Sequence, residues 1–197
     1  MPTYTTADIR NIVLVGHGGS GKTTLADALL LASGTVNRKG SVADGTSFSD
    51  FEKEEKEHKH SIYSSILHAD YQGKRINILD TPGSPDLIGQ ALQCLPAVET
   101  VVVVVNALAG VEIITRRMME AARERNLPRA IVVNKIDLPD VDLPRVVKQI
   151  QETFGSECLP INLPSENGTK VLDCLLNTEG TADFDTVRRC HAAILDQ

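Results

Sequence analysis

Short apolar runs alternate with amphipathic stretches along most of this chain. The run Asn11–Val15 ends in glycines and is followed, at about Lys22–Ser33, by apolar residues at helical spacing, so we expect a buried strand and then a helix. Thr100–Val105 contains five consecutive valines and has no polar face, which predicts a strand at the centre of a largely parallel sheet. Repeated strand–helix alternation of this kind predicts an α/β, doubly wound fold.

Two segments depart from this alternation. Thr35–Lys59 is mostly polar and charged, which predicts a long loop and a candidate switch, with Glu52–Glu57 as a solvated loop or helix face. Ile62–Asp70 and Arg75–Leu79 flank a Tyr-Gln-Gly-Lys turn and predict an antiparallel hairpin. The remaining expectations are helices near Leu87–Leu95 and at Glu112–Arg125, Val141–Phe154 and Phe184–Asp196, a buried strand at Arg129–Val133, and strands at Cys158–Leu163 and Lys170–Leu176.

Composition narrows the class of protein. With 42% hydrophobic and 23% charged residues, the chain has the composition of a globular domain and not of a disordered one. A net charge of −6 and only 4% aromatic residues argue against a nucleic-acid-binding surface within it. The four cysteines form no C-x-x-C pair, and no apolar run is long enough for export or for a membrane span. We therefore expect a cytoplasmic domain with no membrane partner.

A glycine-rich loop between the first strand and the first helix matches the phosphate-binding pattern G-x-x-x-x-G-K-[ST]. Glycines let the backbone N–H groups point inward and form an anion nest beside the helix N-terminus. Lys22 would reach the β- and γ-phosphates of a nucleotide, and the Thr23 hydroxyl would bind Mg²⁺. We expect the side chain of His17 to be packed or solvated, not catalytic. The predicted nucleotide-binding residues of this loop are Gly16, His17, Gly18, Gly19, Ser20, Gly21, Lys22, Thr23 and Thr24.

The N-K-x-D segment formed by Asn134, Lys135 and Asp137 follows a predicted strand, where open α/β sheets bind ligands. The Asp137 carboxylate can accept hydrogen bonds from both N1–H and N2–H₂ of guanine, whereas adenine offers no such pair of donors. Asn134 would support the loop and the base edge, and the Lys135 stem would lie along the base. This motif favours guanine over adenine, although a P-loop ATPase stays as an alternative.

A D-x-x-G segment, Asp80 to Gly83, ends the predicted hairpin. The pattern carries little information alone, but it stands in order between the phosphate loop and N-K-x-D. Asp80 would hold Mg²⁺ through water, and the Gly83 N–H would bind the γ-phosphate, so the segment would relax when that phosphate leaves.

In combination, GHGGSGKTTL, GTSFSDFEKEEKEHKHSI, LDTPGSPDL and VVNKID resemble the GTP-binding domain of translational GTPases, specifically elongation factor G and its elongation-factor-G-like paralogues. The resemblance runs from about Asp8 to the end of the chain, and RKGSVADGTSFSDF is closer to the paralogues. It implies a P-loop GTPase sheet, GTP and GDP as ligands, Mg²⁺ as cofactor, GTP hydrolysis in protein synthesis, and the ribosome as partner.

Two departures from the family pattern bear on the mechanism. Where the family has Arg-Gly-Ile-Thr-Ile, with its Thr on Mg²⁺, this chain has His-Lys-His-Ser-Ile, so the resemblance implies Ser61 as a metal ligand. Where the elongation factors carry a His that orients the attacking water, this chain has Ser84. We therefore expect hydrolysis to be slow without a partner, with Lys22 and Gly83 as the catalytic groups that remain. A GTP-dependent interaction module that does not hydrolyse GTP is the alternative.

The resemblance also predicts the domain organisation. Residues 1–156 would form an incomplete GTP-binding core, and residues 157–197 would form part of an inserted C-terminal subdomain. No Ser-Ala dipeptide, the family's fifth guanine-contacting motif, occurs in the chain. Unless Cys158–Leu163 supplies the missing core strand, we expect weakened guanine affinity.

Overall fold

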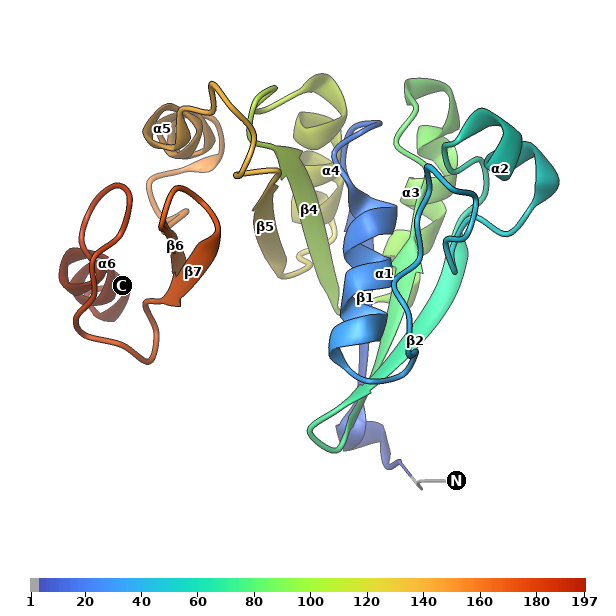
Figure 1. The fold of residues 1–197 in the computed structure, drawn as a ribbon, viewed down its shortest axis with the longest axis horizontal. Helices are drawn as coiled ribbons and strands as arrows, with labels where there is room; N and C mark the ends of the chain where they lie inside the picture. The colour runs from blue at the N-terminus through green and yellow to red at the C-terminus, as the bar shows by residue number, and fades with distance from the viewer. Residues whose placement is uncertain (1–3) are drawn as a thin grey trace. The chain divides into compact units, whose positions relative to one another are not determined.

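The computed structural model describes residues 4–197, and its main element is a five-stranded sheet with the order β2-β3-β1-β4-β5 (Figure 1). β1 pairs in parallel with β3 and with β4, whereas β2 pairs antiparallel with β3. The predicted α/β sheet, mostly parallel with one antiparallel hairpin strand, is therefore confirmed. Its strands are β1 (Ile9–Val15), β2 (Ser65–Tyr71), β3 (Lys74–Asp80), β4 (Thr100–Asn106) and β5 (Arg129–Asn134).

Helices lie in the connections between strands of this sheet and after its last strand, and all but the second lie close to the positions that the apolar spacing predicts. Short 3-10 turns, η1 (Thr6–Asp8), η2 (Pro85–Leu87) and η3 (Leu95–Ala97), precede β1 and flank one of the helices. Among residues 4–197, no helix has the length and apolar character needed to cross a membrane. The helices are α1 (Lys22–Ala32), α2 (Lys53–His58), α3 (Ile88–Cys94), α4 (Ile113–Glu124), α5 (Leu143–Phe154) and α6 (Val187–Leu195).

Strand register determines what lies at the carboxyl edge of the sheet. Leu14 on β1 is opposite Asp80 on β3, and Val15 is opposite Val103 on β4. The Thr81 hydroxyl then donates a hydrogen bond to the Leu14 carbonyl at 2.7 Å, which ties the chain after β3 to β1. The loops that follow β1 and β3 therefore start side by side.

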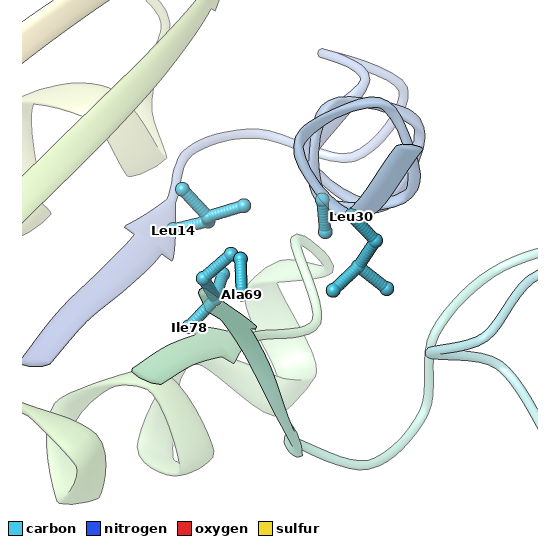
Figure 2. Packing of buried hydrophobic residues seen from close by; sticks show 5 residues of the cluster. Leu14, Leu30, Ala69 and Ile78 are labelled. Carbon is cyan, nitrogen blue, oxygen red and sulfur yellow. The ribbon is translucent and has the colours of Figure 1, made fainter. Parts of the chain in front are cut away.

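A buried apolar cluster joins α1 to the sheet. Leu30 on α1 packs with Leu14, Ala69 and Ile78, which come from β1, β2 and β3 (Figure 2). All four side chains are nearly inaccessible to solvent. Packing of this kind is what keeps a short helix in place, and it fixes the start of α1 directly after the glycine-rich loop.

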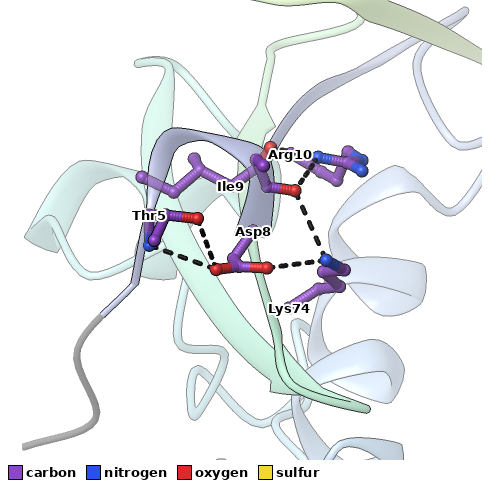
Figure 3. A network of polar contacts seen from close by, with 6 residues as sticks. Thr5, Asp8, Ile9, Arg10 and Lys74 are labelled. Carbon is purple, nitrogen blue, oxygen red and sulfur yellow. Dashed lines mark hydrogen bonds and ion pairs between the residues drawn. The ribbon is translucent and has the colours of Figure 1, made fainter.

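The N-terminal end of β1 is held by a polar network (Figure 3). The Asp8 carboxylate accepts hydrogen bonds from the Thr5 hydroxyl at 2.6 Å and from the Lys74 ammonium at 2.6 Å. These two donors hold the pKa of Asp8 well below its ordinary value. The network links η1 to the start of β3.

The chain divides into two compact units, residues 1–105 with 112–132 and residues 106–111 with 133–197. The second unit contains α5, the antiparallel pair β6 (Asn162–Ser165) and β7 (Lys170–Asp173), and α6. Its own core consists of Leu163, Cys174, Val187 and Cys190. The predicted division into residues 1–156 and 157–197 rests on the resemblance to the family, and it stays a prediction.

Three expectations from the sequence were wrong in detail. Thr35–Lys59 is not a loop throughout, because α2 forms within it and buries Glu55. Arg129–Val133 does form a strand, but none of its residues is buried, since β5 is an edge strand of the sheet. Most of Cys158–Leu163 is irregular, and β6 pairs with β7 in a separate sheet, so this segment adds no strand to the main sheet.

Candidate nucleotide-binding site

The glycine-rich loop runs from the end of β1 into α1 and depends on its glycines. Gly16, Gly19 and Gly21 have φ of 139°, 76° and 95°, a region that favours glycine. A side chain on Gly16 would also collide with the Val104 carbonyl of β4. Between these glycines lie the other members of the loop, His17, Gly18 and Ser20.

Lys22 begins α1 and is buried beneath this loop. Its ammonium donates hydrogen bonds to the carbonyls of Gly16 and His17, both at 3.0 Å. Burial lowers the pKa of Lys22, and the nearby carboxylates of Asp80 and Asp50 oppose that shift. A buried cation that is held by neutral carbonyls is suited to an anionic ligand.

Thr23, Ser61 and Asp80 meet at one point, although they come from three separate segments. The Thr23 hydroxyl donates to Asp80 Oδ2 at 2.7 Å and lies 3.0 Å from Ser61 Oγ. Ser49 also donates to Asp80 Oδ2, at 2.6 Å. Within residues 4–197, the buried Oδ1 atom of Asp80 has no hydrogen-bond partner. The predicted metal ligands are thus brought together at the Asp80 carboxylate, whose Oδ2 accepts from Thr23 and whose Oδ1 is still free to accept.

Asp80 is almost fully buried, and burial raises its pKa to about 6. The hydrogen bonds from Ser49 and Thr23 and the charge of Lys22 act in the opposite direction. A cation bound beside the carboxylate would likewise favour its charged form.

Gly83 lies directly against the phosphate loop. A Cβ atom built on Gly83 would lie 2.6 Å from the Gly18 nitrogen and would also collide with the Lys22 ammonium. There is therefore room for backbone only. This close approach brings the D-x-x-G segment to the phosphate loop, as its order in the sequence predicts.

Asp50 lies among these groups, near Ser61 and Lys22, and no sequence motif pointed to it. Its side chain is buried, and burial raises its pKa, while the neighbouring Ser61 hydroxyl lowers it. Neither carboxylate oxygen meets a donor at full hydrogen-bond geometry within the described chain. The only sequence signal was an acidic residue in a polar loop, which is common at solvated positions and therefore carried no information.

Two other residues of the loop, His17 and Thr24, have surroundings that differ from each other. The His17 ring lies 3.4 Å from Glu112, through Nε2, so its side chain is engaged at the start of α4, in line with the expected packing role. Thr24 is exposed and lines an open hollow of about 570 Å³ together with Gly40, Val42 and two lysines, Lys39 and Lys59.

Asn134, Lys135 and Asp137 lie in the second unit. The Asn134 carbonyl ends β5 and accepts a hydrogen bond from Ala107 N–H at 2.9 Å. Lys135 has a positive φ of 62°, which turns the chain sharply, and Asp137 is exposed beyond that turn. An exposed carboxylate at this position is accessible to a ligand.

The family model of the elongation factor Tu GTP-binding domain matches residues 7–192. The chain belongs to this family. Membership in the elongation factor Tu GTP-binding domain family makes it a GTP-binding domain of a translational GTPase.

Individual relatives agree with this assignment. The chain is 36% identical over 160 residues to an elongation factor G-like protein of Mycobacterium tuberculosis, which covers 81% of this chain and 22% of the relative. It is 37% identical over 161 residues to a mitochondrial ribosome-releasing factor 2 of Drosophila willistoni, covering 82% and 22%. A crystal structure of a Thermus thermophilus protein matches with a TM-score of 0.84 and 32% identity, covering 96% of this chain and 31% of that one. The chain thus spans about a fifth of the length of these curated relatives.

Proposed function

We propose that this chain is a Mg²⁺-dependent guanine-nucleotide switch of the elongation-factor-G-like type, in which the γ-phosphate is sensed by the segments at Ser61 and after Asp80. The observation that carries the proposal is the convergence of Thr23, Ser61 and Asp80 beside the buried ammonium of Lys22. These groups supply hydroxyl and carboxylate oxygens for a hard cation and one positive charge for phosphate.

The donor set fits Mg²⁺. This ion prefers oxygen ligands, is bound through one or two carboxylates together with substrate phosphates, and keeps several waters. Thr23 and Ser61 would contribute hydroxyls, and the unpartnered oxygen of Asp80 would accept from a metal-bound water. Asp50 would be a second water acceptor. When bound, Mg²⁺ would neutralise phosphate charge.

The phosphate loop would bind the nucleotide through backbone N–H groups of the loop and the ammonium of Lys22. The hydrogen bonds from Lys22 to Gly16 and His17 hold the ammonium beneath the loop. Gly83, whose backbone lies against Gly18, would present its N–H to the γ-phosphate. After hydrolysis this contact is lost, so the segment would be released.

Guanine would be recognised by the N-K-x-D residues. Asp137 would accept two hydrogen bonds from the base edge, Asn134 would support the loop, and the stem of Lys135 would cover the base plane. Because no Ser-Ala motif is present in the sequence, we expect the guanine affinity to be weaker than that of a domain with all five motifs.

Hydrolysis by this chain alone would be slow. Ser84 stands where the elongation factors carry a water-orienting His, and its shorter side chain reaches less far. The same observation favours the second candidate function, a module that binds GTP to control an interaction and does not hydrolyse it. Phosphate release under saturating GTP, with and without ribosomes, separates the two, because only the GTPase would be stimulated by ribosomes.

The ribosome is the partner that we propose for the whole protein. One relative is named as a ribosome-releasing factor and another as an elongation factor G-like protein. One of the two is mitochondrial, so a cytoplasmic location for this protein stays a prediction.

A nucleotide titration tests the proposal. Fluorescent GTP, GDP and ATP are titrated into the chain with Mg²⁺ and with EDTA. We expect GTP and GDP to bind, ATP not to compete, and EDTA to weaken GTP binding by about tenfold or more, since one or more charged contacts would be lost. Equal competition by ATP would favour a P-loop ATPase, and insensitivity to EDTA would contradict the Mg²⁺ site.

A further inference from the structure

The backbone that follows Ser61 forms two hydrogen bonds with a side chain of α3. Gln90 Oε1 accepts a hydrogen bond from Ser64 N–H at 2.9 Å, and Gln90 Nε2 donates to the Ile62 carbonyl at 2.8 Å. The two backbone partners determine the orientation of the amide, because only its oxygen can accept and only its nitrogen can donate. Gln90 therefore pairs with this backbone in the way that a neighbouring strand would.

A second side chain holds the same backbone from α2. Glu55 Oε1 accepts from Ile62 N–H at 2.9 Å and from Tyr63 N–H at 3.0 Å. Although it lies in a charged run, Glu55 is only 2% exposed. A buried carboxylate is costly unless its oxygens are satisfied, and these amides satisfy it. We call Glu55 and Gln90 together the backbone clamp.

Gln90 is the member of the backbone clamp that connects two segments which the proposed function treats as sensors, while Glu55 holds the same backbone from α2. This backbone begins one residue after Ser61, whose hydroxyl lies 3.0 Å from Thr23 Oγ1. α3, which carries Gln90, follows the Asp80–Gly83 segment after a single 3-10 turn. Because Gln90 is bonded to this backbone, a shift of α3 would displace the backbone beside Ser61, and a shift of Ser61 would displace α3.

We propose that Gln90 and Glu55 are positioning residues: Gln90 couples the segment after Asp80 to the backbone beside Ser61, and Glu55 holds that backbone where Gln90 contacts it. This inference rests on the proposed nucleotide switch. A ligand favours one arrangement of the two segments only if it binds that arrangement more tightly. The γ-phosphate of GTP would contact both the segment at Ser61 and the segment after Asp80. GDP has no γ-phosphate and would not make these contacts. Loss of the backbone clamp should therefore weaken GTP binding more than GDP binding.

The test compares Gln90→Met with Gln93→Met in the full chain. Methionine keeps the length of the side chain and removes both hydrogen bonds, and Gln93 is an exposed residue of the same helix. Affinities for fluorescent GTP and GDP are measured with Mg²⁺. We expect Gln90→Met to weaken GTP binding by about tenfold, the value of two neutral hydrogen bonds, and to leave GDP within about twofold. Gln93→Met should change neither.

Glu55 provides a conservative rescue. Glu55→Gln keeps an oxygen that can accept from both amides, so GTP affinity should stay within about threefold of the wild type. Glu55→Met removes the acceptor and should reproduce the selective loss of GTP affinity. Glu54→Met, at an exposed neighbour on α2, is the matched control.

Amide hydrogen exchange of the nucleotide-free chain provides a readout that does not depend on nucleotide. Gln90→Met should accelerate exchange at Ser64, and Glu55→Met at Ile62 and Tyr63. Unchanged exchange would overturn the backbone clamp itself. Equal weakening of GTP and GDP, or of neither, would overturn the coupling. A wild-type chain that binds no nucleotide would overturn the proposed function and the coupling with it, while the exchange data would still report whether the clamp exists.

Discussion

The surroundings of Asp80 support the role that is proposed for this residue. One of its oxygens accepts from the hydroxyls of Thr23 and Ser49, and the other is buried without a partner in the described part of the chain. A carboxylate used only for packing would be expected to have both oxygens satisfied. The unsatisfied oxygen therefore supports the proposed role of Asp80 as an acceptor for a ligand or for a water.

At the same scale, Asp137→Asn tests the recognition of guanine. An amide in place of the carboxylate faces the N1–H of guanine with a weaker acceptor and a competing donor, so we expect GTP affinity to fall by about 100-fold. Xanthosine triphosphate, which carries an acceptor where guanine has N2–H₂, should gain affinity. Competition against fluorescent GTP measures both, with Asp140→Asn, an exposed neighbour, as the control. Unchanged GTP affinity would contradict the proposed role.

Lys74→Met tests the polar network at the start of β1. The hydrogen bond from Lys74 is the largest cause that holds the pKa of Asp8 below 3.8, so its removal should raise that pKa toward 3.8. A carboxylate whose pKa is lower in the folded state than in the unfolded state stabilises the folded state above its unfolded-state pKa, and this stabilisation is lost as pH falls through the folded-state pKa. The variant lacks this contribution, so it should lose less stability on acidification. NMR titration of the Asp8 carboxyl measures the shift, and Lys53→Met, an exposed lysine on α2, should leave it unchanged. An unaltered pKa in Lys74→Met would contradict the assigned cause.

At the scale of elements, α2 is a helix that forms within a polar segment without an apolar face. A helix of six residues is not stable in isolation. Here Glu55 is buried and accepts from Ile62 and Tyr63, while Glu52 N–H donates to Glu55 Oε2 at 3.3 Å near the helix start. The hydrophobic pattern could not reveal this helix, because a carboxylate and backbone amides hold it in place and no apolar face does.

Lys59→Gly tests the end of α2. Lys59 follows the helix with a φ of 57°, a left-handed conformation that costs a residue with a Cβ about 1–2 kcal/mol. Glycine removes this cost but loses more backbone entropy on folding, so we expect the free energy of unfolding to rise by about 0.5–1 kcal/mol. Urea denaturation measures it. Lys56→Gly, inside the same helix, should lower stability by about 1 kcal/mol. A destabilised Lys59→Gly would show that the lysine side chain contributes more than its backbone conformation costs.

At the scale of the whole molecule, the two units have separate hydrophobic cores. Leu14, Leu30 and Ile78 belong to the core of the first, and Leu163 and Val187 to that of the second. The predicted phosphate-binding residues lie in the first unit and the N-K-x-D residues in the second. The two sets of predicted residues therefore depend on different hydrophobic cores.

Val187→Ala tests whether these cores unfold separately. Val187 is fully buried on α6, and its truncation should cost about 2 kcal/mol. Amide exchange should accelerate in β6, β7 and α6 and stay unchanged in β1 and β3. Val171→Ala, at a 58% exposed position on β7, is the control. Equal acceleration in both units would mean that the chain unfolds as one cooperative body.

Much of the architecture followed from the apolar pattern. The five valines of β4 required cover on both faces, and β4 does lie inside the sheet, next to β1. The pattern misjudged β5, because an apolar run does not distinguish an edge strand from a central one. The order of strands in a sheet depends on pairing between segments that are far apart in the sequence, so a local pattern of residues does not determine it.

The sequence by itself determined the class of fold, the phosphate loop with its glycines and Lys22, and the family, because each depends on residues that are adjacent in the chain. Only the tertiary structure decided that Asp50 and Ser49 belong with Asp80, and that Gln90 holds the backbone after Ser61. The physical reason is that burial and hydrogen bonding depend on distances in space. A Gln or an Asp in a polar stretch has the same local signature whether it is solvated or clamped in place.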